Sequence, residues 1–141
     1  MVRREFLEDL KKKLNLLKDH KDILAVLLYG SQLYEDYVTN RSDIDICVVA
    51  PDCKDLVKLQ LDLYGVVRDP KIDIKVFELL PLYLKIEIIE SHEIIFAKDV
   101  PRLYEYFYKY RKIWKDQRYR NRISDEEFWT IIKNMKKKLR T

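Results

Sequence analysis

Glycine is scarce in this sequence, since only Gly30 and Gly65 occur among 141 residues. Cysteine is equally scarce, and Cys47 and Cys53 are too few to build a disulfide framework or a site of paired cysteine metal ligands. Long apolar runs are also missing, because the longest one, residues 23–29, is much shorter than a membrane span. These absences lead us to expect a soluble, cytoplasmic protein without a membrane contact.

The length of the chain predicts one domain, 1–141, rather than two. Within it we expect a catalytic core at about 20–100 and basic, aromatic helices at about 101–140. Charge is unevenly placed, because residues 102–141 hold 13 Lys and Arg against 5 Asp and Glu, whereas the whole chain has a formal net charge of +4. This basic end suits an acidic protein, RNA or nucleotide phosphates, and a solvated pair of helices is the plainer alternative.

Hydrophobic periodicity predicts an α/β (α+β) protein with a small sheet of about four strands flanked by helices and a C-terminal helix pair. Gly65 is expected to end the second helix in the left-handed conformation. The expected elements, in chain order, are a helix at 4–19, strands at 23–29 and 42–49, a helix at 52–64, a strand at 71–77, a helix at 81–90, a strand at 93–97 and helices at 101–117 and 124–139.

The pair Gly30-Ser31 follows the first predicted strand. If Gly65 caps a helix, Gly30 is the remaining glycine at which the backbone must turn freely or be approached closely. Free amide groups and a hydroxyl after a strand can hold a phosphate chain, so Gly30-Ser31 is a candidate triphosphate site. The ordinary alternative is a turn followed by a serine cap.

Three aspartates form the second candidate feature. Asp43 and Asp45 are two residues apart in a predicted strand, so their side chains project from the same face. Two like charges so placed favour a bound cation, and carboxylate oxygens suit magnesium. If the strand that carries Asp73 lies beside them, three carboxylates meet, and such a trio can hold two magnesium ions for an in-line displacement at phosphorus. Alternatively, each aspartate is simply a polar residue at a strand entrance.

In combination, Gly30-Ser31, then Asp43-Ile44-Asp45, then Asp73 on the next strand resemble the DNA polymerase beta-type nucleotidyltransferase superfamily over residues 23–77. The short length is similar to that of the minimal nucleotidyltransferases, the MNT-type antitoxins paired with HEPN-domain toxins. This resemblance implies a mixed sheet of the polymerase beta-like fold. It also implies a transferase that moves AMP from ATP to a tyrosine of a HEPN-type toxin and so silences it.

Residue roles follow from the same resemblance. Gly30 and Ser31 are expected to hold the β and γ phosphates of ATP, and Asp43 and Asp45 to bind the magnesium ions. Asp73 completes the metal site and could assist deprotonation of the acceptor hydroxyl.

The chain departs from the family pattern just after Gly30-Ser31. Many relatives have an arginine there, whereas residues 32–36 add negative charge in this chain. Arg41 is the residue that we expect to compensate by contacting the nucleotide.

Two other functions are compatible with the sequence. The first is a non-enzymatic module that neutralises a partner through its C-terminal helices, in a homo-oligomer or a hetero-complex. The second is nucleotidyl transfer to an RNA end or a small hydroxyl compound. The aromatic residues between Tyr104 and Trp114 bear on both, because they cannot all face the core, and the remainder suits a protein partner better than nucleic acid.

Overall fold

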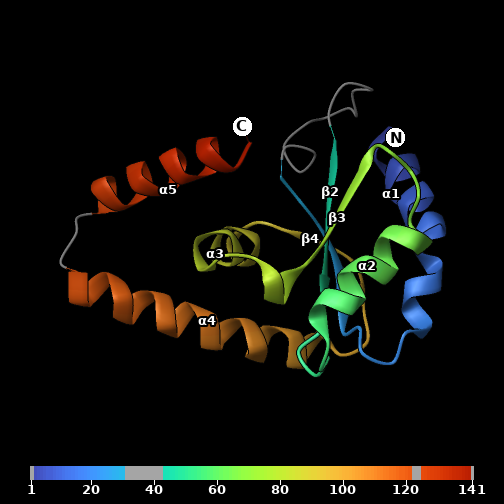
Figure 1. The fold of residues 1–141 in the computed structure, drawn as a ribbon, viewed down its shortest axis with the longest axis horizontal. Coiled ribbons are helices and arrows are strands. Elements are labelled where there is room, and N and C mark those ends of the chain that lie inside the picture. The colour runs from blue at the N-terminus through green and yellow to red at the C-terminus, as the bar shows by residue number, and fades with distance from the viewer. Residues whose placement is uncertain (1, 31–42, 122–124, 141) are drawn as a thin grey trace.

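The computed structural model describes residues 2–30, 43–121 and 125–140 (Figure 1). Within them the chain forms four strands, five α-helices and two short 3-10 helices. The strands are β1 (Ala25–Tyr29), β2 (Ile44–Val49), β3 (Ile72–Val76) and β4 (Glu93–Ala97). The helices are α1 (Val2–Lys13), η1 (Asn15–Asp19), α2 (Leu56–Val66), η3 (Phe77–Leu79), α3 (Leu82–Glu90), α4 (Val100–Asn121) and α5 (Asp125–Arg140).

The four strands form one mixed sheet in the order β3-β2-β1-β4. Strand β1 is antiparallel to both of its neighbours, whereas β2 and β3 run parallel. The parallel pair needs a crossover, and α2 supplies it. The expected α/β class, four-stranded mixed sheet and C-terminal helix pair are therefore confirmed.

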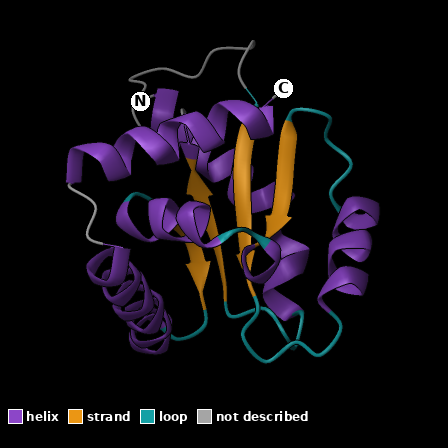
Figure 2. Cartoon of the chain, turned by 60° about the vertical axis from the view of Figure 1, so that its left-hand side comes forward, coloured by secondary structure: helices purple, strands orange, loops and turns teal. Residues whose placement is uncertain are grey.

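Helices cover both faces of the sheet (Figures 1 and 2). On one face α1, η1 and α2 bury leucines against Ile44 and Ile46, and on the other face α3 and α4 pack around Phe77 and Phe107. Side chains alternate along a strand, so Cys47 and Val49 point to the α3 and α4 face. By the same alternation, the odd-numbered positions of β2 and β3 also point there.

The open edge of β3 is covered by a side chain of α2. The amide group of Gln60 donates a hydrogen bond to the carbonyl of Ile74 at 2.9 Å and accepts one from the N–H of Val76 at 2.8 Å. An edge strand presents unpaired backbone groups, and here one side-chain amide satisfies two of them in the way that a neighbouring strand would. This pairing fixes α2 beside β3.

A half-buried carboxylate fixes the connection after β3. Glu78 of η3 accepts hydrogen bonds from the N–H of Ala50 at 3.0 Å and from the hydroxyl of Tyr106 at 2.8 Å. Burial raises the pKa of Glu78, although both hydrogen bonds oppose that shift. Glu78 thus joins the end of β2 to α4.

Two sequence-based expectations about helices were wrong. The helix expected at 4–19 is α1 followed by the tighter η1, in which the N–H of Leu17 bonds to the carbonyl of Leu14, and both of these leucines are buried. Gly65 does not end α2 in the left-handed conformation, because the helix continues to Val66 and the N–H of Val67 bonds to the carbonyl of Leu63. Backbone hydrogen bonds thus continue into η1 after α1 and terminate α2 at Val66, and neither needs a glycine cap.

The aromatic residues of α4 divide as expected between core and surface. Phe107 is buried, and Tyr106, Tyr110 and Trp114 pack partly against the same core, whereas Tyr104 and Tyr108 are exposed. Ser124, the first residue of the helix expected at 124–139, lies outside the described residues. Among the described helices, none combines the length and apolarity needed to cross a membrane.

Candidate active site

A cavity of about 500 Å³ lies on the α3 face of the sheet, where β1, β2 and β3 meet α2, α3 and α5. This volume is within the range typical of small-molecule sites. Its charged lining residues are Asp45, Asp73, Lys75, Glu87 and Lys136. Figure 2 shows that α5, which carries Lys136, passes close to one end of the strands.

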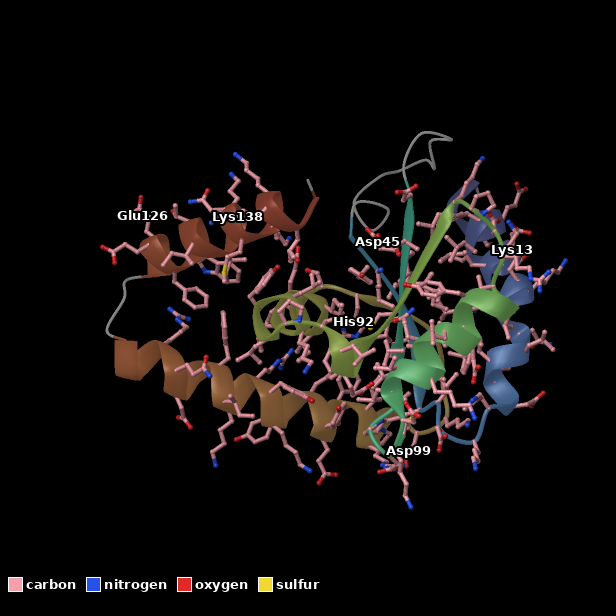
Figure 3. The ribbon with its side chains drawn as sticks, in the orientation of Figure 1. Lys13, Asp45, His92, Asp99, Glu126 and Lys138 are labelled. Atoms are coloured by element: carbon pink, nitrogen blue, oxygen red, sulfur yellow. The ribbon has the colours of Figure 1, made fainter. Side chains whose placement is uncertain are left out.

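Asp45 and Asp73 are direct neighbours in the sheet. They are paired in the register of the parallel strands β2 and β3, and both line the cavity. Adjacent strands are about 4.8 Å apart, so the two carboxylates leave the same face side by side. Figure 3 shows Asp45 between the sheet and the helices α3 and α5. The structure thus brings together two of the three predicted acidic residues.

Gly30 lies against Asp45. Its φ of +83° is in the left-handed region, and a Cβ atom placed on it would come within 2.4 Å of Oδ2 of Asp45. Glycine is therefore needed at this position both for the turn after β1 and for the space that the carboxylate occupies. The expectation that Gly30 marks a free turn and a close approach is confirmed, whereas its contact with phosphates stays a prediction.

Lys75 shares the face of Asp73, as the alternation along β3 predicts. Its ammonium is 3.6 Å from Oδ1 of Asp73 and 3.4 Å from the hydroxyl of Tyr64 on α2. Burial lowers the pKa of Lys75, but the charge of Asp73 and the hydrogen bond to Tyr64 outweigh it, so the pKa is raised overall. The cavity therefore contains a positive charge beside its carboxylates.

Tyr29 also lines the cavity, and it is paired with Asp45 in the β1–β2 register. Burial raises its pKa strongly, and the neighbouring Cys47, Asp45 and Asp73 add to the rise. The phenol of Tyr29 therefore keeps its proton at neutral pH and is not available as a base.

The remaining predicted residues are less well placed. Asp43 immediately precedes β2 and is exposed, and it is not among the described residues that line the cavity. Ser31 and Arg41 lie outside the described residues, so their expected contacts with the nucleotide stay predictions.

The donor set suits a magnesium nucleotide better than a metal ion bound by protein alone. Within residues 2–30, 43–121 and 125–140, no three His, Cys, Asp or Glu side chains are grouped as a metal site. Magnesium usually needs only one or two carboxylates, because waters and substrate phosphates complete its octahedral shell. Asp45 and Asp73 fit that requirement.

The lining residues that sequence reasoning did not assign to the site include Tyr64, Lys75, Glu87 and Lys136. Lys75 was visible as a neighbour of Asp73 on the same strand face, but nothing in the sequence placed Tyr64 next to it. Glu87 of α3 and Lys136 of α5 form an ion pair, although the two residues are 49 positions apart along the chain. Only the folded chain reveals such a pair.

Comparison with known proteins gives the same class of protein. The family model described as "Polymerase beta, Nucleotidyltransferase" matches residues 11–100. The curated protein "Putative protein adenylyltransferase MJ1547" of Methanocaldococcus jannaschii is 44% identical over 109 residues, which cover 77% of this chain and 82% of that protein.

Solved structures share the fold at lower identity. A chain of a toxin-antitoxin complex crystallised with AMP-PNP matches with a TM-score of 0.56 at 19% identity, covering 92% of this chain and 97% of that one. A chain from the complex of the tri-AMPylated Shewanella oneidensis HEPN toxin with its MNT antitoxin matches with a TM-score of 0.54 at 18% identity, covering 96% and 98%. These structures share the fold. The family match and the 44% identical relative show that the chain belongs to the polymerase beta nucleotidyltransferase family and is an enzyme of this class.

Proposed function

We propose that this enzyme transfers AMP from magnesium-bound ATP to a tyrosine hydroxyl of a HEPN-type toxin and acts as its antitoxin. The observation that carries the proposal is the pairing of Asp45 with Asp73 inside a cavity of nucleotide size, with Gly30 against Asp45. The relative named as a protein adenylyltransferase supports AMP as the transferred group. The neighbour structures, one with AMP-PNP and one with a tri-AMPylated HEPN toxin, support ATP and the partner.

Each residue has a role in this scheme. Asp45 and Asp73, with Asp43 at the entrance of β2, hold the magnesium ions, which neutralise phosphate charge and stabilise the leaving pyrophosphate. Gly30 and Ser31 hold the β and γ phosphates, and Arg41 contacts the nucleotide. Asp73 accepts the proton of the attacking tyrosine hydroxyl.

Lys75 adds a role that the family resemblance did not include. Its ammonium neutralises Asp73 in the nucleotide-free protein, because the two groups are 3.6 Å apart. A triphosphate brings several negative charges into the same cavity, and Lys75 is a lining cation 3.6 Å from one of the paired carboxylates. It therefore supplies a phosphate contact on the β3 side of the site.

The test is transfer of label from α-labelled ATP, with magnesium, into a lysate of the source cell. Asp45→Asn and Asp73→Asn are compared with the wild type and with Asp62→Asn, an exposed residue of α2 outside the cavity. We expect a labelled protein with the wild type and Asp62→Asn. Labelling by the two site variants should fall by about a hundredfold or more, the scale found when one charge-stabilising group is removed.

The outcomes separate the candidate functions. Mass spectrometry of the labelled band identifies the partner and shows whether AMP is on tyrosine. Persistent labelling by Asp45→Asn or Asp73→Asn would contradict the assignment of the site. Label in RNA would replace the protein acceptor by an RNA end, and no transfer from any of the four nucleoside triphosphates would favour the non-enzymatic binding module.

A further inference from the structure

Tyr83, in the first turn of α3, is a lining residue to which no role has been assigned so far. Its side chain is only 8% exposed, and its ring packs with Phe128 and Ile132 of α5. The residue lines the site cavity and also a second hollow of about 450 Å³ between α3, α4 and α5. It is therefore part of the wall between the site cavity and this second hollow.

Among the described residues, the hydroxyl of Tyr83 finds no hydrogen-bond partner. Among the buried side-chain nitrogen and oxygen atoms of the described residues, it is the one atom in this state. A buried donor or acceptor left unpaired costs about 1–3 kcal/mol, and native proteins contain few of them. Burial also raises the pKa of Tyr83, so the phenol keeps its proton and can donate. The hydroxyl has almost no accessible surface where it lies, but Tyr83 lines the site cavity, so a ligand there would complete this donor once the side chain turns to meet it.

The chemistry of the cavity wall indicates which part of a ligand lies there. Strands β2 and β3 contribute the charged residues Asp45, Asp73 and Lys75. On the α3 side, Leu80 and Leu84 flank Tyr83 with apolar surface, and the charge of Glu87 further along the helix is paired with Lys136 of α5. Phosphates and their magnesium ions belong at the charged side. A flat nucleobase belongs against the apolar side, where its polar edge atoms need a partner.

We propose that the hydroxyl of Tyr83 hydrogen-bonds to the nucleobase of the bound nucleotide and that the base lies against the apolar wall formed by α3. The inference rests on the proposed function, because it takes the cavity to be the nucleotide site. It assigns recognition of the base to α3 and recognition of the phosphates to the strands. A site with a polar group poised for the base discriminates against analogues that cannot pair with it.

Tyr83→Phe tests this inference, since it removes one oxygen atom and keeps the ring. Calorimetric titration with magnesium ATP and, separately, with magnesium tripolyphosphate is compared with the wild type and with Tyr108→Phe, an exposed residue of α4. We expect Tyr83→Phe to bind ATP about five- to tenfold more weakly, the effect of one hydrogen bond. Its affinity for tripolyphosphate should be unchanged, because that probe carries no base.

Unfolding in urea without nucleotide provides the second readout. Since the hydroxyl has no partner in the protein, Tyr83→Phe should be at least as stable as the wild type. A loss of stability would mean that the hydroxyl is bonded within the protein, and this would overturn the inference.

Equal weakening of ATP and tripolyphosphate binding would also overturn it, because the effect would then concern the shape of the cavity rather than the base. If the wild type binds ATP and Tyr83→Phe binds it equally well, the inference fails while the proposed function stands. If the wild type binds no nucleoside triphosphate, the proposed function fails and the inference fails with it.

Discussion

Gly30 and Gly65 differ in what surrounds them. Gly30 has a φ of +83° and lies against a carboxylate oxygen, whereas Gly65 lies inside α2 with no atom within 4 Å of the position that a Cβ would take. The one glycine is required by conformation and space. The other only weakens a helix.

Replacing each glycine by alanine should therefore change stability in opposite directions. Gly30→Ala is expected to lower the free energy of unfolding by about 1–3 kcal/mol, because the left-handed conformation is strained for alanine and the methyl group meets Asp45. Gly65→Ala should raise it by about 0.5–1 kcal/mol through helix propensity. Urea unfolding monitored by circular dichroism measures both, and each variant is the control of the other. A similar loss in both variants would contradict this account.

The elements differ in how far their bounds could be predicted from sequence. The bounds of strand β4 and helix α3 were predicted within one residue. Pro81 marks the start of α3, and β4 is a short apolar run with charged residues at its limits. The division of the helix expected at 4–19 was missed, since leucines at spacings of three and four suit an α-helix and a 3-10 turn alike. Bounds depend on such local competition, whereas the order of the elements depends on the pattern as a whole.

Strand β3 depends on α2 for its outer edge, and this dependence can be measured. Gln60→Leu removes the side-chain amide that pairs with Ile74 and Val76, and it should lower the free energy of unfolding by about 1–2 kcal/mol. The amide proton of Val76 should exchange with solvent faster than in the wild type. Hydrogen exchange followed by NMR gives this readout for the single residue.

Leu61→Ala is the matched control for that experiment, because Leu61 is an exposed neighbour on the same helix. It should leave the exchange of Val76 unchanged. If Gln60→Leu also left this exchange unchanged, the side-chain amide would not be what protects the edge of β3.

At the scale of the whole molecule, buried aromatic and aliphatic side chains and an ion pair attach α5 to α3 and α4. Phe128 and Ile132 pack against Tyr83 and Trp114, and Lys136 pairs with Glu87. The positions of Lys136 and Leu139 in the cavity wall could not be predicted from sequence, since they depend on how the two C-terminal helices turn back over α3. The aspartate motif, by contrast, lies within two neighbouring strands, and its geometry follows from their register.

Loosening α5 should affect the site more than the sheet. The double change Phe128→Ala and Ile132→Ala removes the two buried residues of α5, and each such truncation costs several kcal/mol of packing. We expect limited proteolysis to cleave the last helix at least about tenfold faster, with the helix and strand content of residues 2–121 kept. Affinity for magnesium ATP should fall, because part of the cavity wall is lost.

Trp129→Ala serves as the control, since that side chain is 48% exposed and lies on the same helix. It should change neither the rate of cleavage nor the affinity for ATP. If the protease cleaved α5 as slowly in the double variant as in the wild type, other contacts would hold the helix in place.

The family model ends at residue 100, whereas α5 begins at Asp125. The segment that carries the paired carboxylates is therefore separate along the chain from the segment that covers them. A change in α5 therefore alters the cover of the cavity without altering the strands that carry the carboxylates. A chimaera that joins residues 1–121 to the last helix of a relative would show which half of the chain decides the choice of acceptor.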